Sequence, residues 1–204
     1  WCPAAAELTF MSAAAMKFNG IDCHVSRAGY TGEDGFEISI AAAHALDVAR
    51  TLLGHEDVEP AGLGARDSLR LEAGLCLYGA DIDETTSPVE AGLAWSIGKR
   101  RLREGGFPGA ARIREEIEKG AKRKRVGIVP GGGAPAREGT QILSKGGQPI
   151  GQVTSGGFGP TFGGPLSMGY VESVYGEPGA PLMLMIRGKE RPAHVAALPF
   201  VAHR

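Results

Sequence analysis

A glycine-rich stretch that ends in a carboxylate is the part of this chain whose residue types most directly suggest chemistry. It reads GYTGEDGFE from Gly29 to Glu37. Glycine reaches backbone angles that other residues avoid and lets a ligand approach the backbone closely. The apolar and polar residues alternate over 36–40, which predicts a half-buried strand. Glu37 would then lie on the polar face, where its carboxylate could accept two parallel N–H donors from a planar heterocycle. The same pattern also fits a plain hairpin turn with a solvated glutamate.

A second motif supplies guanidinium groups. The run GLGARDSLRLEAG over 62–74 predicts a helix at 63–75. Arg66 and Arg70 are one helical turn apart and therefore share a side of that helix. Together with Asp67 and Glu72, they supply the polar face of the helix.

Metal chemistry is not predicted. The acidic run Asp81-Ile82-Asp83-Glu84 has closely spaced carboxylates, but it lacks the glycine and the distal glutamate of an EF-hand loop. The five histidines and three cysteines form no His/Cys cluster and no CxxC pair. Three widely spaced cysteines are typical of reduced thiols in a reducing compartment.

Composition favours a folded domain of ordinary type. The chain has 204 residues, 43% hydrophobic and 22% charged, which is enough for one large or two small domains. A net charge of −1 argues against binding to nucleic acid or to a membrane surface through bulk charge. The apolar runs are too short to span a membrane. The counts of 32 glycines and 13 prolines predict a fold rich in turns and strands.

The elements that would position these groups change character along the chain. The first part predicts a loop or short helix over 8–21, a strand over 23–27, a helix over 41–53 and a strand over 94–97 with Trp95 in a core. A helix over 110–119 follows. Short strands separated by turns then predict a small antiparallel barrel or jelly roll; these are expected at 126–129, 141–143, 150–154, 167–171, 181–186 and 194–197.

Several motifs in the same order resemble the aminomethyltransferase of the glycine cleavage system, its T protein. They are the two runs above, YGADIDETTSPVEAGL over 78–93, GGFPG over 105–109, KRVG over 124–127, GQVTSG over 151–156 and LPFV over 198–201. The resemblance implies an α+β fold, in which an antiparallel-sheet folate-binding domain is followed by a small all-β antiparallel barrel or jelly roll. We expect residues 1–110 to be the C-terminal part of the folate-binding domain and 111–204 to be the barrel.

The resemblance also implies a reaction. A lipoylated H protein carries an aminomethyl group, and the enzyme releases ammonia and passes the one-carbon unit to tetrahydrofolate. Glu37 matches the family residue that accepts the two adjacent N–H donors of the pterin, and Arg66 matches the arginine at the pterin edge. Tyr30 is expected to line the site. Arg125 looks like a structural or active-site arginine of the family, or else belongs to an exposed basic run. No metal, nucleic acid or membrane is implied.

The resemblance further implies that a longer chain precedes Trp1 and holds the aspartate that the family uses in catalysis. We therefore expect no catalytic residue in the present chain and little transferase activity from it alone. The family would be cytoplasmic in a bacterium and in the mitochondrial matrix of a eukaryote.

Three alternatives stay open at the sequence level. The folate module of a sarcosine or dimethylglycine oxidoreductase has the same fold, although no GxGxxG fingerprint for its flavin domain is present. A non-catalytic folate-binding or iron–sulfur-assembly relative would carry a KGCYxGQE-type motif where this chain reads TSPVEAG at 86–92. A structural fragment that binds nothing alone is the third.

Overall fold

The computed structural model describes residues 1–202, which divide into two compact units, Trp1–Leu69 and Arg70–Ala202. Helices and antiparallel strands occur in the chain, as expected for the α+β class. No helix among the described residues has both the length and the apolar character needed to cross a membrane.

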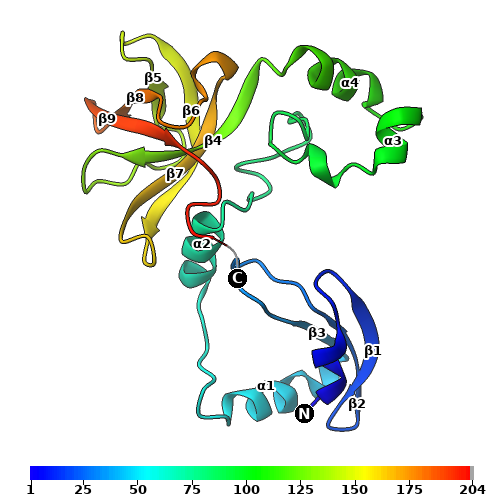
Figure 1. The fold of residues 1–204 in the computed structure, drawn as a ribbon. Helices are drawn as coiled ribbons and strands as arrows, with labels where there is room; N and C mark the ends of the chain where they lie inside the picture. Colours follow the sequence, from blue (N-terminus) through cyan, green and yellow to red (C-terminus); the bar gives the residue numbers. More distant parts are fainter. Residues whose placement is uncertain (203–204) are drawn as a thin grey trace. The chain divides into compact units, whose positions relative to one another are not determined.

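The first unit is built on a three-stranded antiparallel sheet of order β1-β2-β3 (Figure 1). These strands are Ala13–Phe18, Ile21–Ser26 and Glu37–Ile40. β1 turns into β2 at Asn19 and Gly20, which both have positive φ, so this turn contains the residue types that tolerate such angles. The short 3-10 helices η1 (Pro3–Glu7) and η2 (Ala42–His44) flank the sheet in sequence, and η2 leads into α1, Ala45–Leu53.

One apolar cluster joins the sheet to α1. Phe18, Cys23 and Val25 from the sheet are buried with Val48 from α1, and Leu52 packs against them. Val48 and Leu52 are four residues apart and so lie on the same helix face. This packing holds β2 and β3 rigid, and those two strands flank the glycine-rich stretch.

Helices connect the sheet to the barrel along the chain. α2 covers Leu63–Glu72, and the short 3-10 helix η3 covers Ala94–Ser96. α3 covers Lys99–Glu104 and α4 covers Ala110–Lys119. The α4 bounds agree with the prediction for 110–119.

The second unit contains a closed six-stranded antiparallel barrel in the order β4-β7-β6-β5-β8-β9 (Figure 1). A 3-10 helix, η4 (Ser173–Tyr175), follows β7. All six expected strands are present: β4 Arg123–Pro130, β5 Gln141–Leu143, β6 Pro149–Gly159, β7 Gly164–Glu172, β8 Pro181–Ile186 and β9 Lys189–Ala196. The prediction of a small antiparallel barrel is therefore confirmed.

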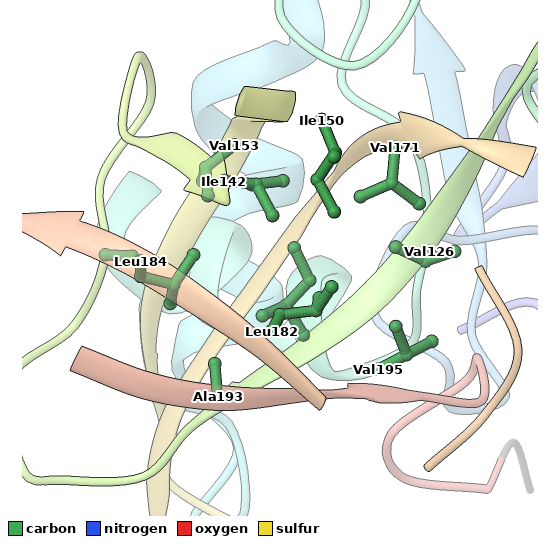
Figure 2. Close-up of a cluster of buried hydrophobic side chains, with 11 residues drawn as sticks. Val126, Ile142, Ile150, Val153, Val171, Leu182, Leu184, Ala193 and Val195 are labelled. Carbon is green, nitrogen blue, oxygen red and sulfur yellow. The ribbon is translucent and has the colours of Figure 1, made fainter. Parts of the chain in front are cut away.

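Branched aliphatic side chains fill the barrel (Figure 2). Ile128, Ile142 and Leu184 are 0% exposed, and burying each such side chain contributes about 1.5–3 kcal/mol. The strands come unusually close at Gly151, where a Cβ atom would lie 1.9 Å from the Tyr170 carbonyl oxygen. Glycine is required there because any side chain would push the strands apart.

Two predictions from the sequence were wrong, one for the segment over 8–21 and one for Trp95. The segment over 8–21 contains strand β1 instead of a loop or short helix, because it pairs along its length with β2. Trp95 lies in η3, not in a strand, and its side chain is 81% exposed instead of buried in a core.

Candidate functional site

The glycine-rich stretch is the connection between β2 and β3. Ser26 and Glu37 are directly opposite each other in the ladder, and residues 27–36 form the loop between them. Glu37 is the first residue of β3 and is exposed, whereas Ile38 and Ile40 pack against the core of the unit. The strand therefore holds the Glu37 backbone while its carboxylate faces outward, as predicted.

Two of the predicted site residues contact each other. The guanidinium carbon of Arg66, in α2, lies 4.6 Å from the centre of the Tyr30 ring. This distance is well within the range of a cation–π contact, which orients the flat guanidinium over the ring. The structure thus joins a residue of the glycine-rich loop to the helix of the second sequence motif.

Two charged groups of the first unit are available to a ligand. Within residues 1–202, neither the Glu37 carboxylate nor the Arg66 guanidinium makes a hydrogen bond or an ion pair to another residue. Both side chains are exposed. An outward carboxylate and an arginine that stacks on an aromatic ring together suit a planar ligand with both donors and acceptors.

A charged pair in the same loop was not predicted as part of the site. Arg27 Nε donates to Asp34 Oδ1 at 2.8 Å, and Arg27 Nη2 donates to Asp34 Oδ2 at 2.7 Å. The hydrogen bond from Arg27 is the main cause that lowers the pKa of the Asp34 carboxyl. The sequence did contain a signal, since an arginine and an aspartate stand at the two ends of a glycine-rich loop.

Arg125 lies in the second unit and is partly buried. Its Nε donates to the Ala91 carbonyl at 2.9 Å, and its Nη1 donates to the Gly74 carbonyl at 2.8 Å. Its backbone N–H donates to the Glu90 carbonyl at 2.8 Å. These bonds tie the start of the barrel to the chain segments before it.

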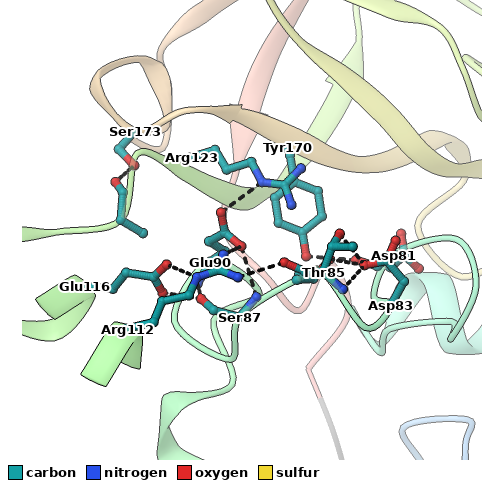
Figure 3. Close-up of polar contacts among 12 residues, drawn as sticks. Asp81, Asp83, Thr85, Ser87, Glu90, Arg112, Glu116, Arg123, Tyr170 and Ser173 are labelled. Atoms are coloured by element: carbon teal, nitrogen blue, oxygen red, sulfur yellow. Dashed lines mark hydrogen bonds and ion pairs between the residues drawn. The ribbon is translucent and has the colours of Figure 1, made fainter. Parts of the chain in front are cut away.

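A buried ion pair anchors the acidic loop of the second unit. Arg70 Nη1 lies 2.7 Å from Asp81 Oδ2, and the two side chains are 3% and 0% exposed. Asp81 also accepts hydrogen bonds from Thr154 Oγ1 and Ser155 Oγ in β6. The Tyr170 hydroxyl donates to the Asp81 carbonyl at 2.8 Å (Figure 3). Arg70 of the motif at 62–74 therefore helps to pack the acidic loop against the barrel.

A second polar cluster surrounds Glu90 (Figure 3). Its carboxylate accepts hydrogen bonds from Arg123 Nε at 3.0 Å, Arg112 Nη2 at 2.8 Å and the Ser87 backbone N–H at 3.0 Å. Burial works to raise the pKa of Glu90, but the bonds from Arg123 and Ser87 and the two guanidinium charges outweigh it and lower that pKa. The Arg123 guanidinium also lies 4.7 Å from the centre of the Tyr170 ring.

An open hollow of about 760 Å³ lies beside this cluster and is lined in part by Glu84, Ser87, Arg101, Phe107 and Arg112. None of the four predicted site residues lines it. Among the described residues, no group of three or more His, Cys, Asp or Glu side chains is arranged to hold a metal ion.

Comparison with known families decides the family of this chain. Residues 3–101 match the family model described as the GCVT N-terminal domain, and residues 123–202 match the glycine cleavage T-protein C-terminal barrel domain. The chain belongs to the glycine cleavage T-protein family. The resemblance seen in the sequence motifs is thereby confirmed, and the barrel formed by β4 to β9 falls within the matched barrel domain.

Curated proteins that are similar to this chain are named aminomethyltransferase. The chain is 53% identical to a mitochondrial aminomethyltransferase of Gallus gallus over 96% of this chain and 50% of that protein. It is 50% identical to a mitochondrial aminomethyltransferase of Solanum tuberosum over 91% of this chain and 46% of that protein. The chain thus spans about half the length of the curated relatives it matches.

A solved structure extends the comparison to three dimensions. The crystal structure of the glycine cleavage system aminomethyltransferase T from Bartonella henselae matches with a TM-score of 0.92 at 44% identity. The match covers 98% of this chain and 54% of that one. The T-protein family therefore accounts for the fold, and the motifs at 29–37 and 62–74 lie within the matched N-terminal domain.

Proposed function

We propose that the chain functions in a tetrahydrofolate-dependent aminomethyltransferase of the glycine cleavage system and supplies its folate-binding residues. In this reaction, the one-carbon unit passes from the aminomethyl-lipoyl arm of H protein to tetrahydrofolate, ammonia leaves and 5,10-methylene-tetrahydrofolate forms. The observation that carries the proposal is the identity of 50–53% with proteins named aminomethyltransferase over more than 90% of this chain.

The first unit would bind the pterin ring of tetrahydrofolate. That ring presents a 2-amino group and a ring N–H side by side, and a carboxylate accepts such a pair through both oxygens. Glu37 is suited to this role because it faces outward from a rigid strand and is not engaged by another described residue. Charge-assisted bidentate hydrogen bonds of this kind are among the strong ones in proteins.

Arg66 and Tyr30 would hold the edge and the face of the same ring. A guanidinium donates in a fixed fork to ring carbonyl and nitrogen acceptors, and it can stack on an aromatic plane. The contact at 4.6 Å between Arg66 and the Tyr30 ring limits the orientations that the guanidinium can take before the ligand arrives. Preorganisation of this kind reduces the ordering cost of binding.

Arg125 would support the fold instead of touching the substrate. Its guanidinium is already engaged with the Ala91 and Gly74 carbonyls, both in the second unit. The transfer itself depends on holding two reactants in the right geometry, and such positioning can account for a large part of a rate enhancement. The binding residues named here would contribute to catalysis in that way.

A titration of tetrahydrofolate into this chain, followed by calorimetry, tests the site. We expect binding that Glu37→Gln weakens at least about tenfold, which is about 1.4 kcal/mol. The matched control is Glu59→Gln, which neutralises an exposed glutamate of the same unit outside the loop. Equal binding by the wild type and Glu37→Gln would refute the assignment of Glu37, and the absence of binding to the wild type would refute the folate site in this unit.

Transfer is best measured in a chimera, because the chain spans about half the length of its curated relatives. In this chimera, the half of the Gallus gallus protein that the chain does not match is joined ahead of Trp1. Aminomethylated H protein and tetrahydrofolate are added, and ammonia release is followed. We expect release that depends on tetrahydrofolate and falls in Glu37→Gln; release that is unaffected by tetrahydrofolate would contradict the proposed reaction.

A further inference from the structure

The loop that carries the proposed folate site has no ladder of its own. Residues 28–36 belong to no helix or strand, although Tyr30 lies within this segment and Glu37 follows it directly. Ordering a loop residue that has no such pairing costs conformational entropy. The ladder with β2 already holds the Glu37 backbone. Side-chain contacts are therefore needed if Tyr30 is also to be in place before a ligand binds.

The ion pair between Arg27 and Asp34 joins the beginning of this loop to a residue near its end. The two parallel N–H···O bonds, at 2.8 and 2.7 Å, make a bidentate guanidinium–carboxylate pair, whose planar fork fixes direction as well as distance. The third guanidinium nitrogen, Arg27 Nη1, donates at 2.8 Å to the carbonyl of Leu8. Asp34 is thereby joined to the segment that leads into β1, not only to its own loop.

The same guanidinium reaches the residue next to Glu37. Arg27 lies 5.6 Å from the centre of the Phe36 ring. Nearby, a Cβ atom added to Gly35 would lie 3.9 Å from the Ala28 carbonyl oxygen, so the two ends of the loop approach closely. Both ends of the loop are thus fixed relative to the sheet.

The pair is placed to control geometry more than overall stability. The side chains of Arg27 and Asp34 are 29% and 50% exposed, and ion pairs this exposed usually contribute little to the free energy of folding. Arg27 is also held through its backbone, whose N–H donates to the Ser12 carbonyl at 3.0 Å. The backbone at Arg27 is therefore held without the ion pair, and the part of the chain that the ion pair restrains is the loop.

We infer that Arg27 and Asp34 are positioning residues of the folate site, which hold the loop so that Tyr30 is preorganised for the pterin ring beside Glu37, whose backbone the strand holds. The inference rests on the proposed function. Neither residue contacts the ligand in this scheme. Losing the pair would leave the contact groups present but placed over a wider range of positions, and affinity would fall through the added ordering cost.

The test compares Asp34→Asn with a matched control. Asp22→Asn removes a surface ion pair of the same unit, Lys17–Asp22 at 2.6 Å, that lies away from the loop. We expect Asp34→Asn to raise the Kd for tetrahydrofolate about tenfold, with Asp22→Asn and the charge-conserving Asp34→Glu close to the wild type. The urea midpoint should be similar for all three variants, because each changes only an exposed carboxylate.

Two readouts separate positioning from a general structural role. In the unliganded chain, amide hydrogen exchange over 28–36 should become faster in Asp34→Asn and stay unchanged in Asp22→Asn. In a Tyr30→Ala background, Asp34→Asn should have a smaller effect on the Kd than it has alone, because the side chain it positions has already been removed.

The outcomes distinguish this inference from the proposed function. If the wild type binds tetrahydrofolate through Glu37 and Asp34→Asn binds equally well, the positioning role is wrong and the proposed site stands. If exchange becomes faster but the Kd is unchanged, the pair orders the loop without serving the site, and the inference is again overturned. If the wild type does not bind, the proposed folate site fails, and the inference fails with it.

Discussion

Replacing Asp81 with alanine should destabilise the second unit severely. The carboxylate is buried and accepts hydrogen bonds from Arg70 Nη1 at 2.7 Å, the Leu77 backbone N–H at 2.9 Å, Thr154 Oγ1 at 2.5 Å and Ser155 Oγ at 2.8 Å. All of these partners lose their acceptor in Asp81→Ala. The Arg70 side chain, which is 3% exposed, also loses the carboxylate with which it forms an ion pair.

The magnitude follows from the burial of the pair. Removing one partner of a buried ion pair costs about 3–5 kcal/mol, because the other charge stays buried and uncompensated. The lost hydrogen bonds do not add at full value, since deletions within one network are not additive. We expect a loss of about 4 kcal/mol. A typical domain has a free energy of unfolding of about 5–15 kcal/mol, so this is a large share of it.

Urea unfolding followed by circular dichroism measures the loss, and amide exchange over β6 assigns it to the barrel unit. The matched control is Glu84→Gln, which neutralises an exposed carboxylate of the same acidic run. Arg70→Met combined with Asp81→Ala should cost less than the sum of the two single changes, because no charge is left unpaired. An Asp81→Ala protein that unfolds within about 0.5 kcal/mol of the control would refute this reasoning.

Three further predictions concern Glu90, the folate site and Arg125. The fold lowers the pKa of Glu90 from 4.5, so the ionised side chain stabilises the second unit above about pH 4.5. This contribution is lost as the pH falls through the lowered pKa, and Glu90→Gln should therefore flatten the acid side of a plot of urea midpoint against pH. Arg66→Lys and Tyr30→Ala should each raise the Kd for tetrahydrofolate about tenfold by calorimetry, because lysine lacks the planar fork and alanine removes the ring beneath it; an unchanged Kd in both would exclude this contact from the site. Arg125→Met should lower the free energy of unfolding by about 1–3 kcal/mol, because two carbonyls lose their donor, and it should leave the Kd unchanged; lost binding at unchanged stability would instead mark Arg125 as a ligand contact.

The barrel strands were predictable because each is a short apolar run between turn residues. The pattern left open whether these strands form a barrel or a jelly roll, because the order of the strands depends on long-range pairing, such as that of β4 with both β7 and β9. β1 was missed for a different reason. Its sequence, AAAMKF, is rich in alanine, which is depleted in strands, and only the pairing of Ala13–Phe18 with β2 makes it one. Trp95 misled the prediction because a large aromatic side chain is more often buried than exposed.

The candidate site was predictable only in part. Glu37 and the loop were indicated by glycine spacing and alternation, and Arg66 and Tyr30 followed from the resemblance to the family. Their mutual contact at 4.6 Å could not be predicted from the sequence, in which the two residues are 36 positions apart. The pairing of Arg27 with Asp34 was missed because both charges look like ordinary surface residues until the loop between them is folded.

Closure of the barrel also has a consequence for a chain that is still being synthesised. β4 emerges from the ribosome before β7 and β9, yet it depends on one of them at each edge. Until Lys189–Ala196 has been made, β4 and β8 each keep an unpaired edge, and such edges readily pair with other chains. Long-range pairings of this kind also form slowly. A nascent chain that stalls or stops within β9 should therefore aggregate, even though it already contains most of the buried side chains of the finished barrel.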